Sequence, residues 1–309
     1  MKGIFIKLFS LTLFVASSNF LLASVNIQTS VDIGGIKQWI SIKGANDSDP
    51  VLLFLHGGPG NSVMSYADKF TNDLQKHFIV VQWDQREAGT TAKLNASNQP
   101  LTVALMEEDA RELVDYLRLK FSRDKIFLMG HSWGGFLGLK LAADHPDLFE
   151  AYFAVSPMVY QDESEQRSLA WMKEKGKGNT QELKELAMVR IPFQSVGDLY
   201  YHRKWLAVGM GSKAPFKAFV ESWDKKWLGL FLEASKVNFF EVAPEIKCPI
   251  YFFVGKRDYQ THSGLTEEYY KMLKAGKKDL FWFTNSAHNL NLTESRKFQQ
   301  IVISLKSKN

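Results

Sequence analysis

A serine between glycines is the feature of this 309-residue chain with the clearest chemical meaning. Gly130–Gly134 reads GHSWG and follows the apolar run Ile126–Met129, which has the composition of a buried strand. An apolar segment with small residues at helical spacing, Phe136–Ala143, comes next and ends before Pro146. A sharp turn between a strand and a helix holds a serine out of the sheet, so Ser132 is predicted to be a nucleophile.

A second glycine-rich turn lies upstream of the serine. The continuous apolar run Val51–Leu55 predicts a buried strand, and it is followed by the sequence HGGPG at His56–Gly60. Acyl transfer to a serine creates an oxyanion that two backbone N–H groups can stabilise. One donor follows the nucleophile and the other lies in the loop after an earlier strand. We therefore predict an oxyanion hole formed by Trp133 and Gly58, with Gly57 as the alternative to Gly58.

A nucleophilic serine also needs a histidine and a carboxylate, and two loops after strand-like runs supply them. Asp258 follows the run Pro249–Gly255, and His288 follows the run Asp279–Thr284. Nucleophile, acid and histidine then occur in the chain order expected for a serine on this kind of turn. We predict Ser132, Asp258 and His288 as a catalytic triad. The alternatives are Asp162 or Glu163 as the acid and His262 as the base.

Three motifs together resemble the proline iminopeptidase group of the α/β-hydrolases. They are HGGPG at His56–Gly60, the DQR segment at Asp84–Arg86 and the serine turn at Gly130–Gly134. The resemblance extends over most of the chain after about residue 30 and implies the α/β-hydrolase fold and cleavage of short peptides. This chain departs from the group's usual pattern at Glu87 and His131, which both replace a glycine.

The segment 157–244 differs in character from the rest of the chain because it lacks strand-like runs and contains four tryptophans. We expect it to form a helical cap inserted into an α/β-hydrolase core made of residues 24–156 and 245–309. The core should be a mostly parallel sheet with helices on both faces. In the resembled group, cap glutamates hold the free amino group of the substrate. The candidates by location are Glu163, Glu165, Glu174, Glu221 and Glu233.

The first 23 residues have the form of a signal peptide. Two lysines within Met1–Lys7 precede the apolar run Leu8–Val15, and small residues surround the expected cleavage site after Ala23. The apolar run is shorter than the roughly 20 residues that span a bilayer, so no stable membrane anchor is expected. We predict export to the periplasm or the cell exterior.

Composition limits the remaining function classes. A hydrophobic content of 45% over 309 residues is enough for one large core, and the net charge of +5 comes from scattered lysines. We expect no nucleic-acid partner, no metal and no other cofactor, because neither a stacking platform nor a metal-spaced set of cysteines and histidines is present. A small peptide or ester is the expected substrate, and the oligomeric state is left open. We predict an exported serine hydrolase that acts through an acyl-enzyme, namely an aminopeptidase for short peptides. The alternatives are a carboxylesterase, amidase or lactonase on small molecules and, last, a non-catalytic binding protein.

Overall fold

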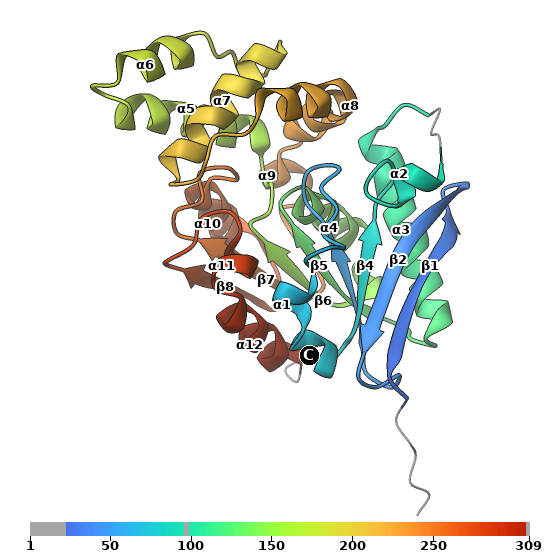
Figure 1. The fold of residues 1–309 in the computed structure, drawn as a ribbon. Helices are drawn as coiled ribbons and strands as arrows, with labels where there is room; N and C mark the ends of the chain where they lie inside the picture. The colour runs from blue at the N-terminus through green and yellow to red at the C-terminus, as the bar shows by residue number, and fades with distance from the viewer. Residues whose placement is uncertain (1–22, 96–98, 307–309) are drawn as a thin grey trace, which may run out of the picture.

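The computed structural model describes residues 23–95 and 99–306, which form one large sheet, helices on both of its faces and a further helical layer (Figure 1). These residues give the sheet eight strands in the order β1-β2-β4-β3-β5-β6-β7-β8. The β1-β2 and β2-β4 pairs are antiparallel, and the other neighbouring pairs are parallel. The strands are β1 (Val25–Ile33), β2 (Ile36–Gly44), β3 (Val51–Leu55), β4 (Ile79–Asp84), β5 (Ile126–His131), β6 (Phe149–Val155), β7 (Ile250–Gly255) and β8 (Lys278–Phe283).

Side-chain alternation along the buried strands explains why both faces of the sheet are covered. On β3, Leu53 packs into one hydrophobic core, whereas Leu52 and Phe54 pack into a second core on the opposite face. A strand buried on both faces reads as a continuous apolar run, as Val51–Leu55 does. The mostly parallel α/β fold predicted from the sequence is confirmed.

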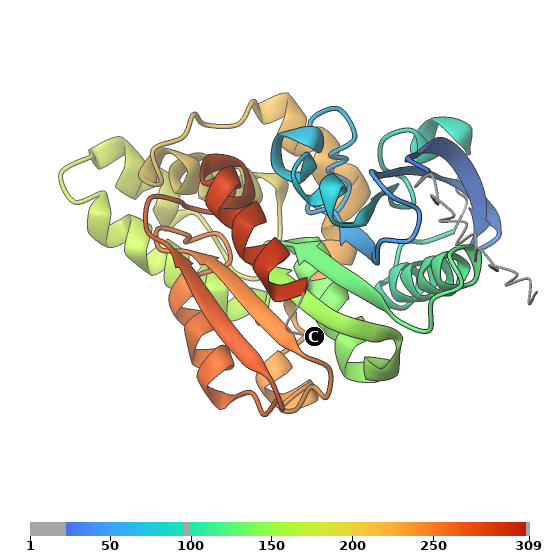
Figure 2. The ribbon, with the colours of Figure 1, turned by 90° about the horizontal axis from the view of Figure 1, so that it is seen from below.

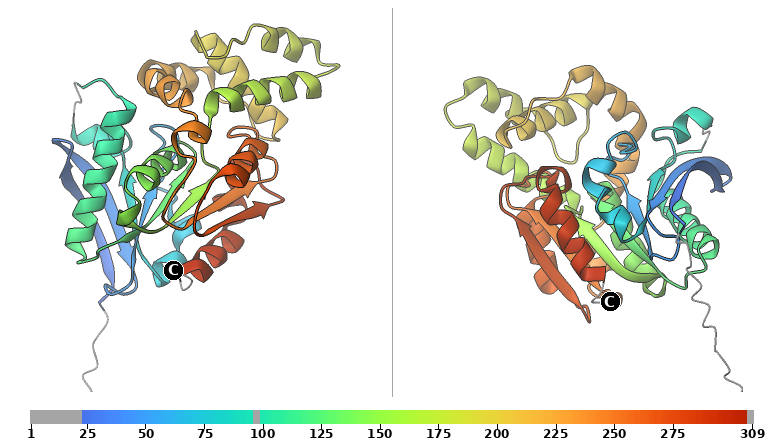
Figure 3. Two further views of the ribbon diagram at one scale, coloured as in Figure 1. Left: turned by 180° about the vertical axis from the view of Figure 1, so that it is seen from behind. Right: turned by 60° about the horizontal axis from the view of Figure 1, so that its bottom comes forward.

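Two groups of helices cover the two faces. Figures 2 and 3 show α3, α4 and α10 on one face, with α1 and α12 on the other. Thr102 ends the loop before α3, and its hydroxyl accepts a hydrogen bond from the N–H of Leu105, as an N-cap does. The helices of the core are α1 (Asp68–Thr71), α2 (Thr91–Leu94), α3 (Val103–Lys120), α4 (Trp133–Asp144), α10 (Ser263–Met272), α11 (Leu290–Thr293) and α12 (Ser295–Lys306), with 3-10 turns η1 (Leu74–Lys76) and η2 (Pro146–Leu148).

The segment between β6 and β7 is helical throughout its regular elements and lies over one end of the sheet (Figure 1). We call the helices of this segment the cap. The expected limits of the cap, 157 and 244, stay a prediction, and the helices fall within them. They are α5 (Gln161–Lys175), α6 (Thr180–Ala187), α7 (Val196–Gly209), α8 (Lys217–Ser235) and α9 (Phe239–Val242).

The expected signal peptide, residues 1–23, lies outside the described residues except for its last residue, Ala23. Within the described ranges, no helix has both the length and the apolar character needed to cross a bilayer.

Candidate active site

Ser132 sits on a strained turn between β5 and α4. Its φ of +58° lies in the left-handed region, which is unfavourable for a residue with a Cβ. The glycines on either side permit the close approach of the backbone. A Cβ at Gly130 would lie 2.1 Å from the carbonyl oxygen of Gly134, and a Cβ at Gly134 would lie 2.1 Å from that of Leu55. The structure therefore explains why glycine occupies both flanking positions.

Asp258 and His288 meet at the ends of the neighbouring strands β7 and β8. His288 Nδ1 lies 2.9 Å from Asp258 Oδ2. The other carboxylate oxygen accepts hydrogen bonds from the N–H groups of Gln260 at 2.9 Å and Thr261 at 3.2 Å. Burial alone would raise the pKa of Asp258, but the charge and hydrogen bond of His288, together with these N–H groups, lower it to about 2. Asp258 is therefore ionised at neutral pH and orients the imidazole.

The alternative acids and base are not part of this arrangement. Glu163 forms an ion pair with Arg167 on the same helix. Asp162 lies beside it on α5, and burial raises its pKa. His262 packs edge-on against the ring of Tyr259. His288 Nδ1–H donates its hydrogen bond to Asp258 rather than to either rival carboxylate.

The residue that precedes Ser132 in the chain, His131, contacts His288 of this pair. The ring of His131 lies 4.8 Å from the ring of His288, and Ser132 lines the same cavity as Thr261. The Thr261 hydroxyl donates to Asp258 Oδ2 at 3.0 Å. Among the described residues, no hydrogen bond joins Ser132 Oγ to the imidazole. Bonds between nucleophile and base commonly shorten only when substrate is bound, so this geometry is compatible with the triad.

His131 is a contact of the site that sequence reasoning missed, because it was interpreted only as part of a turn. Its Nε2–H donates to the carbonyl oxygen of His288 at 3.1 Å. Burial, followed by the nearby charge of His288, lowers the pKa of His131 to about 3. The neutral ring of His131 thus fixes the backbone of His288 without placing a charge beside it. The position of His131 directly before Ser132 is the sequence feature that could have indicated its place in the site.

The HGGPG loop runs close to the serine. A Cβ at Gly57 would lie 3.2 Å from the Cβ of Ser132, and Gly58 and Gly60 line the cavity that Ser132 opens into. Gly58 has a φ of +120°, which only glycine adopts readily. The loop is thus placed where an oxyanion donor is needed, and the assignment of Gly58 and Trp133 as the donors stays a prediction.

Hydrogen bonds connect the three sequence motifs to one another. His56 donates from Nδ1 to the carbonyl oxygen of Gly57 at 2.8 Å and accepts at Nε2 from the N–H of Gln85 at 3.2 Å. The Gln85 side chain donates to the carbonyl oxygen of His56 and accepts from the indole N–H of Trp133, at 3.0 and 2.9 Å. The amide of Gln85 therefore fixes the HGGPG loop relative to the serine turn.

The residues after Gln85 anchor this region in the core and to the cap. Arg86 and Asp109 form a fully buried ion pair, with Nε 2.8 Å from Oδ2. Glu87, which stands where the resembled group has glycine, has a φ of +62°. Its carboxylate lies 2.6 Å from Lys226 Nζ on α8. The substitution thus keeps the left-handed backbone of a glycine and adds a link to the cap.

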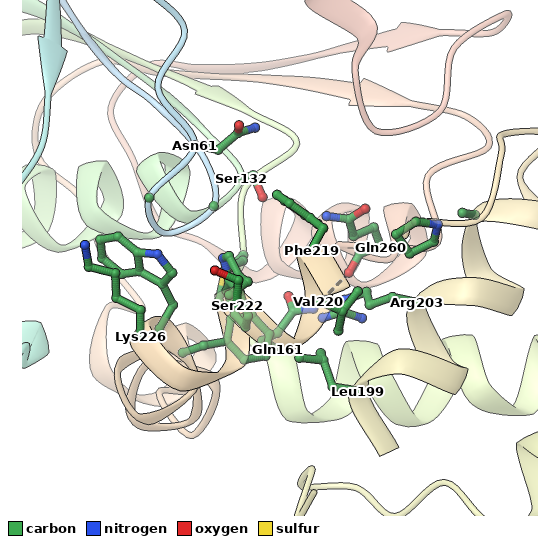
Figure 4. Close-up of a pocket in the computed structure, with 18 of the residues that line it drawn as sticks. Asn61, Ser132, Gln161, Leu199, Arg203, Phe219, Val220, Ser222, Lys226 and Gln260 are labelled. Atoms are coloured by element: carbon green, nitrogen blue, oxygen red, sulfur yellow. Dashed lines mark hydrogen bonds between the residues drawn. The ribbon is translucent and has the colours of Figure 1, made fainter. Parts of the chain in front are cut away.

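A cavity of about 470 Å³ lies between the cap and Ser132 (Figure 4). Aromatic and aliphatic side chains of α8 line much of it, and Trp223 donates its indole N–H to the carbonyl oxygen of Pro59 at 3.0 Å. The charged residues in the lining are Arg203, Lys213 and Lys226. In the described parts of the chain, no Asp or Glu lines this cavity.

None of the five candidate glutamates of the cap faces the cavity. Glu165 contacts two residues that line the cavity: Arg203 donates to both of its oxygens, at 2.6 and 2.7 Å, and Gln161 donates to one of them at 2.7 Å. Glu233 accepts a hydrogen bond from the N–H of Val103 at the start of α3. The other three form ion pairs with lysine or arginine on their own helix or turn: Glu163, Glu174 and Glu221.

The site contains no arrangement suited to a metal ion. Over residues 23–95 and 99–306, no group of three or more His, Cys, Asp or Glu side chains is placed to hold one. Cys248, the single cysteine, is buried, and desolvation raises the pKa of its thiol to about 12, so it has little nucleophilic character.

Comparisons with known proteins agree with this geometry. Residues 50–180 match the family described as the alpha/beta hydrolase fold. A Bacillus subtilis (strain 168) protein named "Probable aminopeptidase YbaC" is 30% identical over 300 residues, which cover 89% of this chain and 94% of that protein. The chain belongs to the α/β-hydrolases. This α/β-hydrolase is an enzyme, and its sequence is similar to proteins named as aminopeptidases and proline iminopeptidases, as the sequence motifs predict.

Another curated protein and two solved structures are also similar to this α/β-hydrolase. The proline iminopeptidase of Thermoplasma volcanium is 26% identical over 180 residues, or 57% of this chain and 59% of that protein. The solved proline iminopeptidase of Mycobacterium smegmatis has a TM-score of 0.64 at 14% identity, over 91% of this chain and 98% of that chain. The enol-lactonase of Burkholderia xenovorans LB400 has a TM-score of 0.62 at 19% identity, over 90% and 99%. These structures show a shared fold.

Proposed function

We propose that this α/β-hydrolase is a serine hydrolase that works through an acyl-enzyme on Ser132. The observation that supports this most strongly is the hydrogen bond of His288 to Asp258, in the same region as the strained serine that lines the cavity. His288 removes the proton of Ser132 as Oγ attacks the carbonyl carbon of the substrate. The N–H groups of Gly58 and Trp133 stabilise the tetrahedral oxyanion.

The same groups complete the acylation of Ser132 and then carry out deacylation. His288 gives its proton to the leaving group as the bond to the carbonyl carbon breaks, which leaves an ester on Ser132. A water molecule then attacks this ester while His288 takes the water proton, and Ser132 leaves with that proton. Asp258 stays ionised throughout, because its pKa lies far below neutral pH.

The charge of the cavity favours a carboxylesterase, amidase or lactonase among the expected hydrolase classes. A free ammonium group on the substrate would need a carboxylate in the lining, and the described lining offers Arg203, Lys213 and Lys226 instead. Glu165, a cap carboxylate that contacts the lining residue Arg203, already has partners on both oxygens. We therefore propose esters, amides or lactones whose acyl group carries no ammonium as the substrates.

An aminopeptidase for short peptides is the second candidate. Its support is the similarity to the Bacillus subtilis protein over 94% of that protein's length.

One substrate pair separates these two candidates. Prolyl arylamide and N-acetyl-prolyl arylamide differ in the charge of the amine. The esterase-type proposal predicts that acetylation does not lower kcat/KM, because the described lining holds cations and no carboxylate. Simple aryl esters should be cleaved faster than either arylamide. A carboxylate that bound the amine would instead make acetylation cost roughly tenfold or more. A tenfold preference for the free amine would therefore establish the aminopeptidase.

Export is a further part of the proposal, and it rests on the leader-like sequence alone. Amino-terminal sequencing of the protein from its native host should find Ser24, or a residue close to it, as the first residue. Recovery of a mature protein that begins at Met1 would contradict export by this leader.

A further inference from the structure

The charged residues that line the substrate cavity in the described structure are all cations. Two of its three cations have acidic partners: Arg203 lies 2.6 Å from Glu165, and Lys226 lies 2.6 Å from Glu87. Arg203 and Lys226 line the cavity, and neither glutamate does. Electrostatic potential in such a cavity is positive even where the pairs are formally neutral.

Lys213 is the third cation, and it differs from the other two. It lies in the exposed segment between α7 and α8, and no hydrogen bond or ion pair joins its ammonium to another described residue. Its charge is therefore uncompensated in the free protein. A carboxylate in the cavity would balance this charge, whereas a substrate ammonium would meet only cations.

The rest of the lining suits a short hydrocarbon chain. Phe219, Val220 and Phe231 provide apolar surface in the cavity that Ser132 opens into (Figure 4). An apolar wall with a few fixed polar groups is the usual composition of a small-molecule site. A substrate with a carboxylate separated from its reacting carbonyl by a few carbon atoms would match both parts of the lining.

We propose that the cavity selects substrates that carry a free carboxylate, with Lys213 as its ion-pair partner. This inference rests on the proposed hydrolase function and narrows its substrate class. Either part of a substrate can supply the group: the acyl part, as in a half-ester of a dicarboxylic acid, or the leaving group, as in the C-terminus of a short peptide. The chemistry recognised by Lys213 is the same in both.

Two serine-reactive probes test the charge preference without assuming a natural substrate. A fluorophosphonate with a terminal carboxylate should inactivate the wild-type enzyme roughly fivefold faster than its methyl ester at low salt. The ratio should fall towards one as ionic strength rises, because salt screens an exposed pair. Lys213→Gln should abolish the preference, so that the carboxylate probe and its methyl ester inactivate this variant at equal rates.

Lys217→Gln is the matched control, because Lys217 is an exposed lysine at the start of α8 outside the cavity. This variant should keep the wild-type ratio. Equal rates for the two probes in the wild type would overturn the inference. So would a preference that survives in Lys213→Gln, since the charge would then act from elsewhere.

Two pairs of substrates locate the carboxylate. A preference for an aryl hemisuccinate over the aryl butyrate places it on the acyl side, and a preference for N-acetyl-prolylglycine over N-acetyl-prolylglycinamide places it on the leaving side. Active enzyme without a preference in either pair contradicts the inference and leaves the hydrolase proposal intact. Protein that reacts with neither probe and cleaves none of the four substrates contradicts both.

Discussion

Ser132→Ala should reduce kcat/KM for any hydrolysed ester by about 10⁶-fold, the scale seen when a serine nucleophile that acts together with a histidine is removed. The substitution removes the Ser132 hydroxyl, which forms the covalent bond to the substrate in the proposed mechanism. Alanine and serine have the same backbone restrictions, so the strained φ of +58° costs the variant no more than it costs the wild type. Initial rates with an aryl ester provide the measurement.

Two controls make this result interpretable. Ser65→Ala changes an exposed serine outside the cavity and should leave the rate unchanged. Thermal unfolding of Ser132→Ala should match the wild type within a few degrees, which shows that the loss is chemical. A Ser132→Ala protein that hydrolyses esters at the wild-type rate would remove the assigned nucleophile.

Asp258→Asn should lower activity by about 10⁴-fold through the tautomer of His288. The oxygen Oδ1 accepts from the N–H groups of Gln260 and Thr261, so an amide oxygen must occupy that position. The amide NH₂ then faces His288 Nδ1, which lies 2.9 Å from Oδ2 in the wild type. The imidazole must accept at Nδ1 and carry its proton at Nε2, where it cannot act as a base towards the serine. Steady-state kinetics give the magnitude.

Asp162→Asn is the matched control for this change, because Asp162 was the alternative acid. It should retain near-normal activity. Loss of activity in Asp162→Asn together with a normal Asp258→Asn enzyme would reverse the assignment of the acid.

The contribution of the Asp258 carboxylate to the stability of the fold depends on pH. The pKa of Asp258 is about 2 in the folded protein, below the value of about 3.9 for an aspartate in an unfolded chain. The ionised carboxylate stabilises the fold fully when the pH lies above the pKa of the unfolded chain. This stabilisation is lost as the pH falls towards the pKa of the folded protein. The difference in free energy of unfolding between wild type and Asp258→Asn should therefore shrink between pH 5 and pH 2. Chemical denaturation at these pH values measures it.

The residues that sequence reasoning placed well are those positioned by local structure. Ser132, Asp258 and His288 each follow an apolar run that forms a parallel strand, and parallel strands end at the same edge of a sheet. The chain order of the three residues was then enough to select them from several candidates. Local pattern and fold class together thus predicted the hydrogen-bonded contact between Asp258 and His288 that the structure shows.

The features that sequence reasoning did not predict depend on contacts between distant parts of the chain. Glu165 was a candidate to bind the substrate, but Arg203, 38 residues away, takes both of its oxygens. Glu87 is a departure from the family motif, and its partner Lys226 is 139 residues further along the chain. No spacing rule connects such pairs, because the cap helices that carry Arg203 and Lys226 are placed by tertiary packing. The charge of the cavity was therefore visible only in the structure.

Mapping the site of covalent labelling tests the central claim most directly. The enzyme is inactivated with a small fluorophosphonate, and the modified residue is identified by mass spectrometry of its peptides. The account predicts one label per chain, located on Ser132, and loss of activity in proportion to labelling. A label on another residue, or full activity in completely labelled protein, would contradict an acyl-enzyme at Ser132.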